Sequence, residues 1–129
     1  MLKNREIYKG ALRILAETSV QGSNEDYEER APYIIAAFYS ECADIDKSYR
    51  RANDLPDAVP VNEVFVSLDD NFPCAARFAS AACVYVAAML IIDENTELSD
   101  KLYDKYSDMM STICSGIPSY VEKISNRYP

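Results

Sequence analysis

The sequence contains no histidine and no tryptophan, and only three of its 129 residues are glycine. Without histidine, nucleophile–base pairs built on imidazole are excluded. Because no Cys-x-x-Cys pair occurs either, zinc sites of the Cys/His type are also excluded. Scarce glycine argues against tight hairpins and against a glycine-rich loop that cradles phosphate. The composition therefore favours helices joined by few connections.

Basic residues are also few, with 13 Lys and Arg against 21 Asp and Glu, a net charge of −8. The longest basic cluster is the pair Arg50-Arg51. Proteins that grip the phosphate backbone normally carry a basic stripe, so we expect no sequence-specific binding of nucleic acid. An acidic surface keeps a protein soluble, and it can also line a passage through which DNA slides without sticking.

Apolar residues make up 49% of the chain and charged residues 26%, which is the composition of a globular protein. We expect a single helical domain over 1–129 with a core of its own. Polar residues at 3–6 interrupt any early apolar run, so we expect no signal peptide and a reduced, cytoplasmic protein. Four cysteines lie within or beside apolar stretches, where free thiols act as small core residues: Cys42, Cys74, Cys83 and Cys114.

Apolar residues at helical spacing predict four helices, of which the first covers about residues 3–17. The second begins near Asn24 or Asp26 and ends near Ala52. Pro32 is out of place in the middle of a helix. It fits if a separate turn precedes it, or if the helix proper begins just before it with proline in the first turn.

The third helix, about Cys74–Asp93, is rich in alanine and apolar almost all round. Asp70 or Asn71 is positioned to cap it. Its charge-free run, Phe78–Ile92, is shorter than the roughly 20 residues that a bilayer requires, so we expect a central core helix and no membrane partner. An all-α, four-helix core around this helix is the fold class that the sequence predicts.

Asn95 or Thr96 caps the fourth helix, and Gly116 ends it. The short tail 117–129 is expected to form one more turn. Between the second and third helices lies an extended linker, about residues 53–73. Within this linker, the β-branched stretch Val61–Val66 is either a short strand whose partner comes from a neighbouring subunit or an extended segment lying over the bundle.

One pattern of carboxylates indicates possible chemistry. Glu25-x-x-Glu28, followed after twelve residues by Glu41-x-x-Asp44, matches the spacing of MazG-like nucleotide pyrophosphohydrolases. In that family four carboxylates on two facing helices hold Mg²⁺ against a nucleoside triphosphate. Here the apolar stripe continues without a turn between the two halves. On one helix Glu28 and Asp44 would be roughly 24 Å apart, so a solvated helix face is the favoured interpretation.

Ten tyrosines are the other unusual feature. Tyrosine offers a large contact area at low entropic cost and is enriched in protein interfaces. Equally, the rings can pack at the edge of a core with their hydroxyl groups in water. Both interpretations stay open for the tyrosines of the second and fourth helices: Tyr33, Tyr39, Tyr49, Tyr103 and Tyr106.

The layout resembles the adaptor proteins of head-to-tail connectors in tailed phages and prophages. The resemblance covers roughly residues 5–115 and rests on Ala11–Leu15, on Val66–Pro73 before the alanine-rich helix, and on Ala87–Leu90 followed by acidic residues. It implies a non-enzymatic ring below the portal through which DNA passes, with portal and tail-completion proteins as partners. It also implies a place in the host cytoplasm and the virion, and no catalytic residue, cofactor or metal.

Two alternatives remain beside the adaptor. One is the Mg²⁺-dependent pyrophosphohydrolase, in which the metal ligands would be Glu25, Glu28, Glu41 and Asp44. The other is a small helical module that binds a helix of a partner protein.

Overall fold

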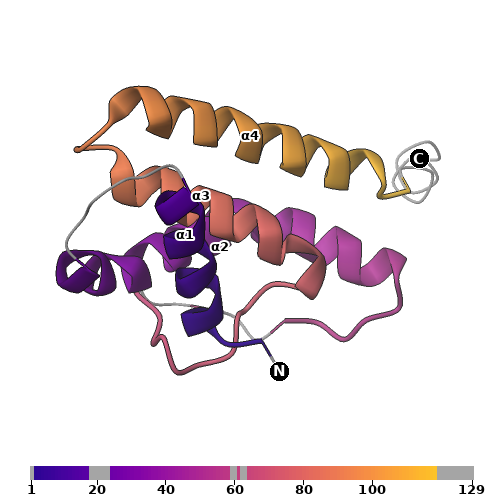
Figure 1. The fold of residues 1–129 in the computed structure, drawn as a ribbon. Helices are drawn as coiled ribbons and strands as arrows, with labels where there is room; N and C mark the ends of the chain where they lie inside the picture. Colours follow the sequence, from indigo (N-terminus) through magenta and orange to yellow (C-terminus); the bar gives the residue numbers. More distant parts are fainter. Residues whose placement is uncertain (1, 18–23, 59–60, 62–63, 119–129) are drawn as a thin grey trace.

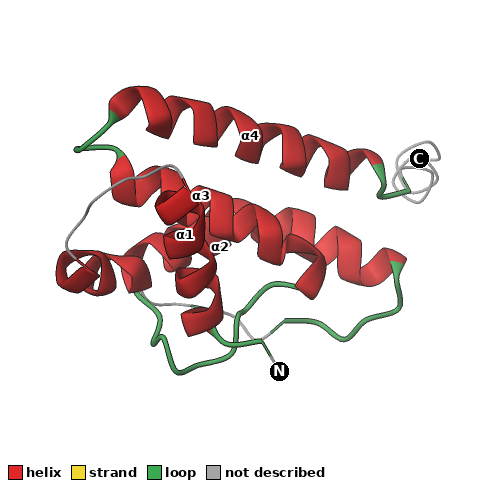
Figure 2. Cartoon of the chain, viewed as in Figure 1, coloured by secondary structure: helices red, strands yellow, loops and turns green. Residues whose placement is uncertain are grey.

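The computed structural model describes residues 2–17, 24–58, 61 and 64–118. Figure 1 shows how the elements are arranged, and Figure 2 shows helices and loops without a strand in this part of the chain. The all-α fold class is therefore confirmed. The elements are α1 (Asn4–Glu17), α2 (Asn24–Ala52), the short 3-10 helix η1 (Ala76–Phe78), α3 (Ala79–Ile91) and α4 (Thr96–Ser115).

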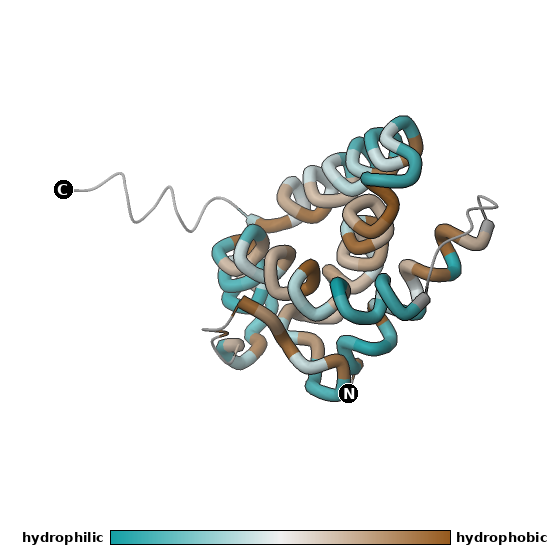
Figure 3. Tube along the Cα trace, turned by 90° about the vertical axis from the view of Figure 1, so that its left-hand side faces the viewer, coloured by the Kyte–Doolittle hydropathy of each residue, from teal (hydrophilic) through white to brown (hydrophobic). Residues whose placement is uncertain are grey.

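Helix α3 is the centre of the fold, as the sequence predicts. It packs against α1, α2 and α4, and in Figure 1 it lies beneath α4 with α1 crossing it. Val86, Ala87, Ala88, Leu90 and Ile91 are completely buried. In Figure 3 the outer helices carry both hydrophilic (teal) and hydrophobic (brown) residues. A helix that is apolar all round, such as α3, has no face suited to water and has to be covered by its neighbours. No described helix is long and apolar enough to cross a membrane.

Helices α1 and α3 cross closely at Gly10. A Cβ atom placed on Gly10 would lie only 2.6 Å from Sγ of Cys83. Glycine in a helix interior costs about 1 kcal/mol relative to alanine. Here that cost is offset because the missing side chain lets the Cys83 thiol pack directly against α1.

Helix α2 runs without interruption from Asn24 to Ala52, with Pro32 inside it. Both arrangements expected for Pro32 are therefore wrong: no separate turn precedes it, and α2 does not begin just before it. Proline removes one hydrogen bond of the helix and bends it. In Figure 1 the first turns of α2 run at an angle to the rest of the helix.

The linker pairs with the N-terminal residues of its own chain. The amide of Phe72 donates to the carbonyl of Leu2 at 2.8 Å, and the amide of Asn4 donates to the carbonyl of Asp70 at 3.0 Å. Of the stretch 61–66, which the sequence allowed as a strand, residues 62 and 63 lie outside the described residues and the others form no strand.

The expected cap of the central helix is wrong. Asp70 and Asn71 do not cap α3, because their backbone is held extended against the N-terminus, with one antiparallel bridge joining Lys3 and Asn71. The chain enters the helix through η1, and α3 proper begins at Ala79 after Phe78, which makes no side-chain capping bond.

Both ends of α4 agree with the sequence. The side chain of Asn95 accepts a hydrogen bond from the amide of Leu98 at 3.0 Å. Gly116 follows the last helical residue, and its amide donates to the carbonyl of Ile113 at 3.1 Å. The turn expected in the tail falls on residues 119–129, which lie outside the described residues.

Candidate protein interface

A groove of about 680 Å³ opens between α2 and α3. Its apolar lining comes from Tyr33, Ile34 and Ala37 of α2 and from Tyr85 and Met89 of α3. We call these five residues the aromatic groove. Met89 follows Tyr85 by one helical turn, so the two lie on one side of α3. The groove therefore runs along a side of the central helix that the described helices leave partly open.

Aromatic rings extend this apolar surface beyond the groove. The ring of Phe65, in the linker, lies 5.6 Å from the ring of Tyr33, and the ring of Tyr103, on α4, lies 6.4 Å from the ring of Tyr85. Tyr33 is 55% exposed and Phe65 is 46% exposed. A contiguous apolar surface of this kind, built from α2, the linker, α3 and α4, is typical of an interaction site.

The inner rings are held in place. Tyr85 lies 5.0 Å from Tyr106 and 5.7 Å from Phe38, measured between ring centroids. Burial raises the pKa of Tyr85, and a hydrogen bond to Glu41 raises it further. The hydroxyl group therefore stays protonated at neutral pH. A fixed ring with one polar handle can be contacted at little entropic cost.

The polar rim of the groove is acidic. Of the two charged residues that line it, Arg30 already donates to Asp26 at 3.1 Å and to the carbonyl of Leu90 at 2.8 Å. Glu29 is exposed, and Glu41 lies beside Tyr85. Because the charge of Arg30 is offset by its acidic neighbour, the groove presents an apolar floor with an excess of negative charge.

Both interpretations of the tyrosines are represented in the structure. Tyr33 and Tyr103 are exposed at the aromatic groove and its edge. Tyr106 is buried, and Tyr39 and Tyr49 are half-buried against the core. The sequence could name the candidates, but only the packing distinguishes the two groups.

The four carboxylates with pyrophosphohydrolase spacing do not come together. Glu25, Glu28, Glu41 and Asp44 are all exposed along the single helix α2. Sixteen residues separate Glu28 from Asp44, which corresponds to roughly 24 Å along a helix. Among the described residues, no group of three or more potential ligands could hold a metal ion. The convergence that the metal-dependent alternative requires is absent from this part of the chain.

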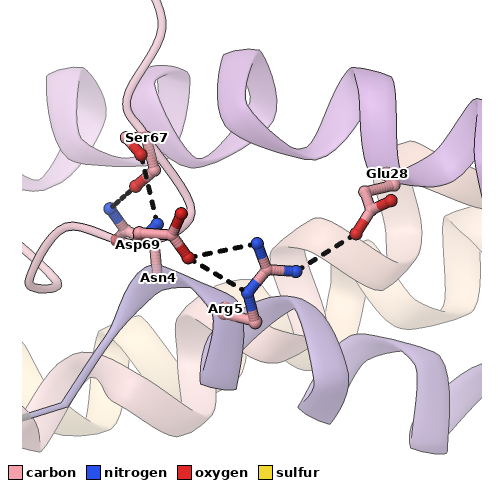
Figure 4. A network of polar contacts seen from close by, with 5 residues as sticks. All are labelled: Asn4, Arg5, Glu28, Ser67 and Asp69. Atoms are coloured by element: carbon pink, nitrogen blue, oxygen red, sulfur yellow. Dashed lines mark hydrogen bonds and ion pairs between the residues drawn. The ribbon is translucent and has the colours of Figure 1, made fainter.

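One of these carboxylates has a partner in the network of Figure 4. Arg5 bridges Glu28 of α2 at 3.1 Å and Asp69 of the linker at 3.2 Å. Beside it, the side-chain amide of Asn4 donates to the carbonyl of Ser67 at 2.9 Å. Exposed ion pairs contribute little to stability, because water and salt screen them. The network therefore aligns α1, α2 and the linker without dominating the stability of the fold.

A buried acid that was not predicted from the sequence anchors the linker. Asp46 is 1% exposed and accepts hydrogen bonds from the amide of Ala75 at 2.7 Å and from Nε of Arg50 at 2.9 Å. Arg50 also donates to the carbonyls of Pro56 at 2.9 Å and Pro73 at 3.3 Å. Both ends of the linker, which carries Phe65, are thus bound to α2.

The cysteines divide by depth. Cys42 and Cys74 are buried, and a hydrogen bond between their side chains, together with burial, raises the pKa of Cys74. Burial also raises the pKa of Cys83, which is half-buried. The expectation of core thiols is confirmed for the buried pair and is wrong for Cys114, which is exposed.

Comparison of the chain with protein-family models, with curated proteins and with solved structures finds no match.

Proposed function

We propose that this chain is a structural, non-enzymatic assembly module of the head-to-tail connector type, which forms a ring below a phage portal. The observation that carries the proposal is the aromatic groove with its exposed rings. Tyr33 and Phe65 are large, about half exposed and in contact with each other. In a ring, such a surface is covered by the neighbouring subunit.

The chemistry of the groove supports protein contact rather than catalysis. Tyrosine, phenylalanine and methionine are enriched in protein interfaces, and hot spots form where aromatic rings enter well-packed pockets. The groove also has the floor and rim that a docked helix needs. A small interaction module that binds a partner helix would use the same surface, so the two proposals differ in the partner and not in the site.

The charge distribution also supports the proposal. Asp100, Asp104 and Asp108 are exposed at four-residue spacing along α4, so they lie on one face of that helix. An acidic face that borders the lumen of a ring repels the phosphate backbone of DNA and lets it pass without binding. Portal and tail-completion proteins would bind at the two rims of such a ring.

The experiment that tests the proposal is a measurement of mass by size-exclusion chromatography with light scattering. We expect the unaltered chain to form a closed oligomer, and Tyr33→Ser to reduce its association. Leu55→Ser is the matched control, because Leu55 is 42% exposed and is not among the residues that line the aromatic groove. A chain that stays monomeric at high concentration and in the presence of portal protein would contradict the proposal.

A second measurement separates this function from the pyrophosphohydrolase. The purified chain is incubated with nucleoside triphosphates and Mg²⁺, beside a Glu41→Gln variant. We expect no hydrolysis by either protein. Hydrolysis that the substitution abolishes would instead establish an enzyme and overturn the structural assignment.

A further inference from the structure

The aromatic groove has the shape and chemistry of a site for an amphipathic helix. Its floor is apolar, from Ile34 and Ala37 on one helix to Tyr85 and Met89 on the next. Recognition of a helix in a groove uses apolar residues at three- and four-residue spacing, which insert between the walls. The acidic rim adds a preference for a helix with basic residues on its outer side.

The chain itself contains a segment with these properties. Residues 119–128 read Ser-Tyr-Val-Glu-Lys-Ile-Ser-Asn-Arg-Tyr. Ser119 and Glu122 have the spacing of a capping box, which is the sequence signature of a helix start. Apolar side chains recur at helical spacing along the segment, at Tyr120, Val121, Ile124 and Tyr128.

The charge of this segment is opposite to that of the rest of the chain. Two basic residues, Lys123 and Arg127, against one acid, Glu122, give the segment a net charge of +1. The whole chain carries −8, so the remainder carries −9. Lys123 and Arg127 are four residues apart and share one face of a helix, to one side of the apolar stripe. This pattern complements an apolar groove with an acidic rim.

We infer that the aromatic groove is the docking site for segment 119–128 of a neighbouring copy of this chain, bound as a short amphipathic helix. The inference rests on the proposed function, because it names the contact through which the subunits associate. A helix of ten residues is marginal in water on its own and gains stability from packing its apolar face. The groove supplies that packing surface.

The reach of the segment favours a neighbouring copy over its own groove. Helix α4 ends at Ser115, nine residues after Tyr106, whose ring contacts the groove residue Tyr85. This separation corresponds to roughly 14 Å along the helix, and a helix over residues 119–128 is about 15 Å long. Helices α3 and α4 run in opposite directions (Figure 1), so a segment folded back along its own α4 would reach the near end of the groove at Tyr85 but not Met89, one helical turn farther on. A head-to-tail contact between copies does not have this limit, and it generates a ring when the rotation closes.

The test uses two full-length variants, each defective on one side of the contact. Ala37→Arg places a bulky cation in the groove, at an exposed position of α2. Ile124→Asp removes an apolar anchor from the segment. Ser107→Arg and Ser125→Asp are the matched controls, since Ser107 is exposed outside the groove and Ser125 lies off the apolar stripe.

We expect each defective variant to weaken self-association at least about tenfold and each control to leave it unchanged. We also expect an equimolar mixture of Ala37→Arg and Ile124→Asp to form a heterodimer, because one intact groove and one intact segment remain. Far-UV circular dichroism and thermal melting of each variant establish that it is folded.

Each other outcome decides against the docking. If Ile124→Asp assembles like the unaltered chain, segment 119–128 is not the occupant of the groove, and the proposed connector function is unaffected. Two monomeric variants that do not combine when mixed indicate docking within one chain or a symmetric contact, and either result overturns the inference. An unaltered chain that stays monomeric overturns the docking and the proposed function together.

Discussion

Removal of the buried carboxylate of Asp46 tests how the linker is held. Asp46→Ala leaves the amide of Ala75 and the guanidinium of Arg50 without their acceptor. Removing one partner of a buried ion pair costs about 3–5 kcal/mol, of which the unpaired amide accounts for about 1–3 kcal/mol. The free energy of unfolding of a domain of this size is about 5–15 kcal/mol. The variant should therefore fold, with a large loss of stability.

The loss is measured by urea denaturation followed by far-UV circular dichroism. Asp44→Ala is the control, because it removes an exposed carboxylate from the same helix and should change the stability by no more than about 0.5 kcal/mol. Hydrogen exchange gives a local measure: the amide of Ala75 should exchange faster in Asp46→Ala, while the amide of Leu98, bonded to Asn95, should not. Equal losses for the two substitutions would refute the anchoring role of Asp46.

Three further predictions concern other contacts. Gly10→Ala should destabilise the fold by about 1–3 kcal/mol in urea denaturation, because its Cβ meets the thiol of Cys83, and the added Cys83→Ala change should restore most of the loss. Burial and a hydrogen bond to Glu94 raise the pKa of Tyr27 to about 12. The protonated hydroxyl of Tyr27 therefore contributes fully to the free energy of unfolding below pH 10, and this contribution is lost as the pH rises through 12. In the Tyr27→Phe variant, the free energy of unfolding should depend less on pH between these values. Asn95→Ala removes the cap of α4 and should lower the thermal midpoint through a loss of about 1 kcal/mol.

The parts of the fold that local signals determine could be predicted from the sequence. Asn95 caps α4 and Gly116 follows its last turn, because both roles depend on neighbours within four residues. The central position of α3 follows from its composition, since a helix without a polar face has to be buried. The separation of the carboxylates along α2 follows from the unbroken apolar stripe beneath them.

Contacts between distant segments could not be predicted. Asp70 and Asn71 have the residue types of a helix cap, yet the N-terminal residues hold their backbone extended, and nothing in the local pattern reveals that pairing. The role of Asp46 has one local signal, its position four residues after Cys42 in the buried stripe and four before Arg50. Its second partner lies 29 residues away, beyond the reach of periodicity.

The residues along α3 differ between its covered sides and its open side. Where α1, α2 and α4 approach it, buried positions include the small residues Ala87 and Ala88. On the open side Tyr85 is followed by Met89, which is half-buried, and by Ile92, which is 42% exposed. Tyrosine and methionine adapt to a partner surface better than to a tight crossing of helices. Large side chains such as Leu90 and Ile91 are also completely buried on the covered sides, so exposure and not size distinguishes the open side. Exposure there increases from 6% at Tyr85 to 42% at Ile92, as expected if a helix from another subunit completes the cover.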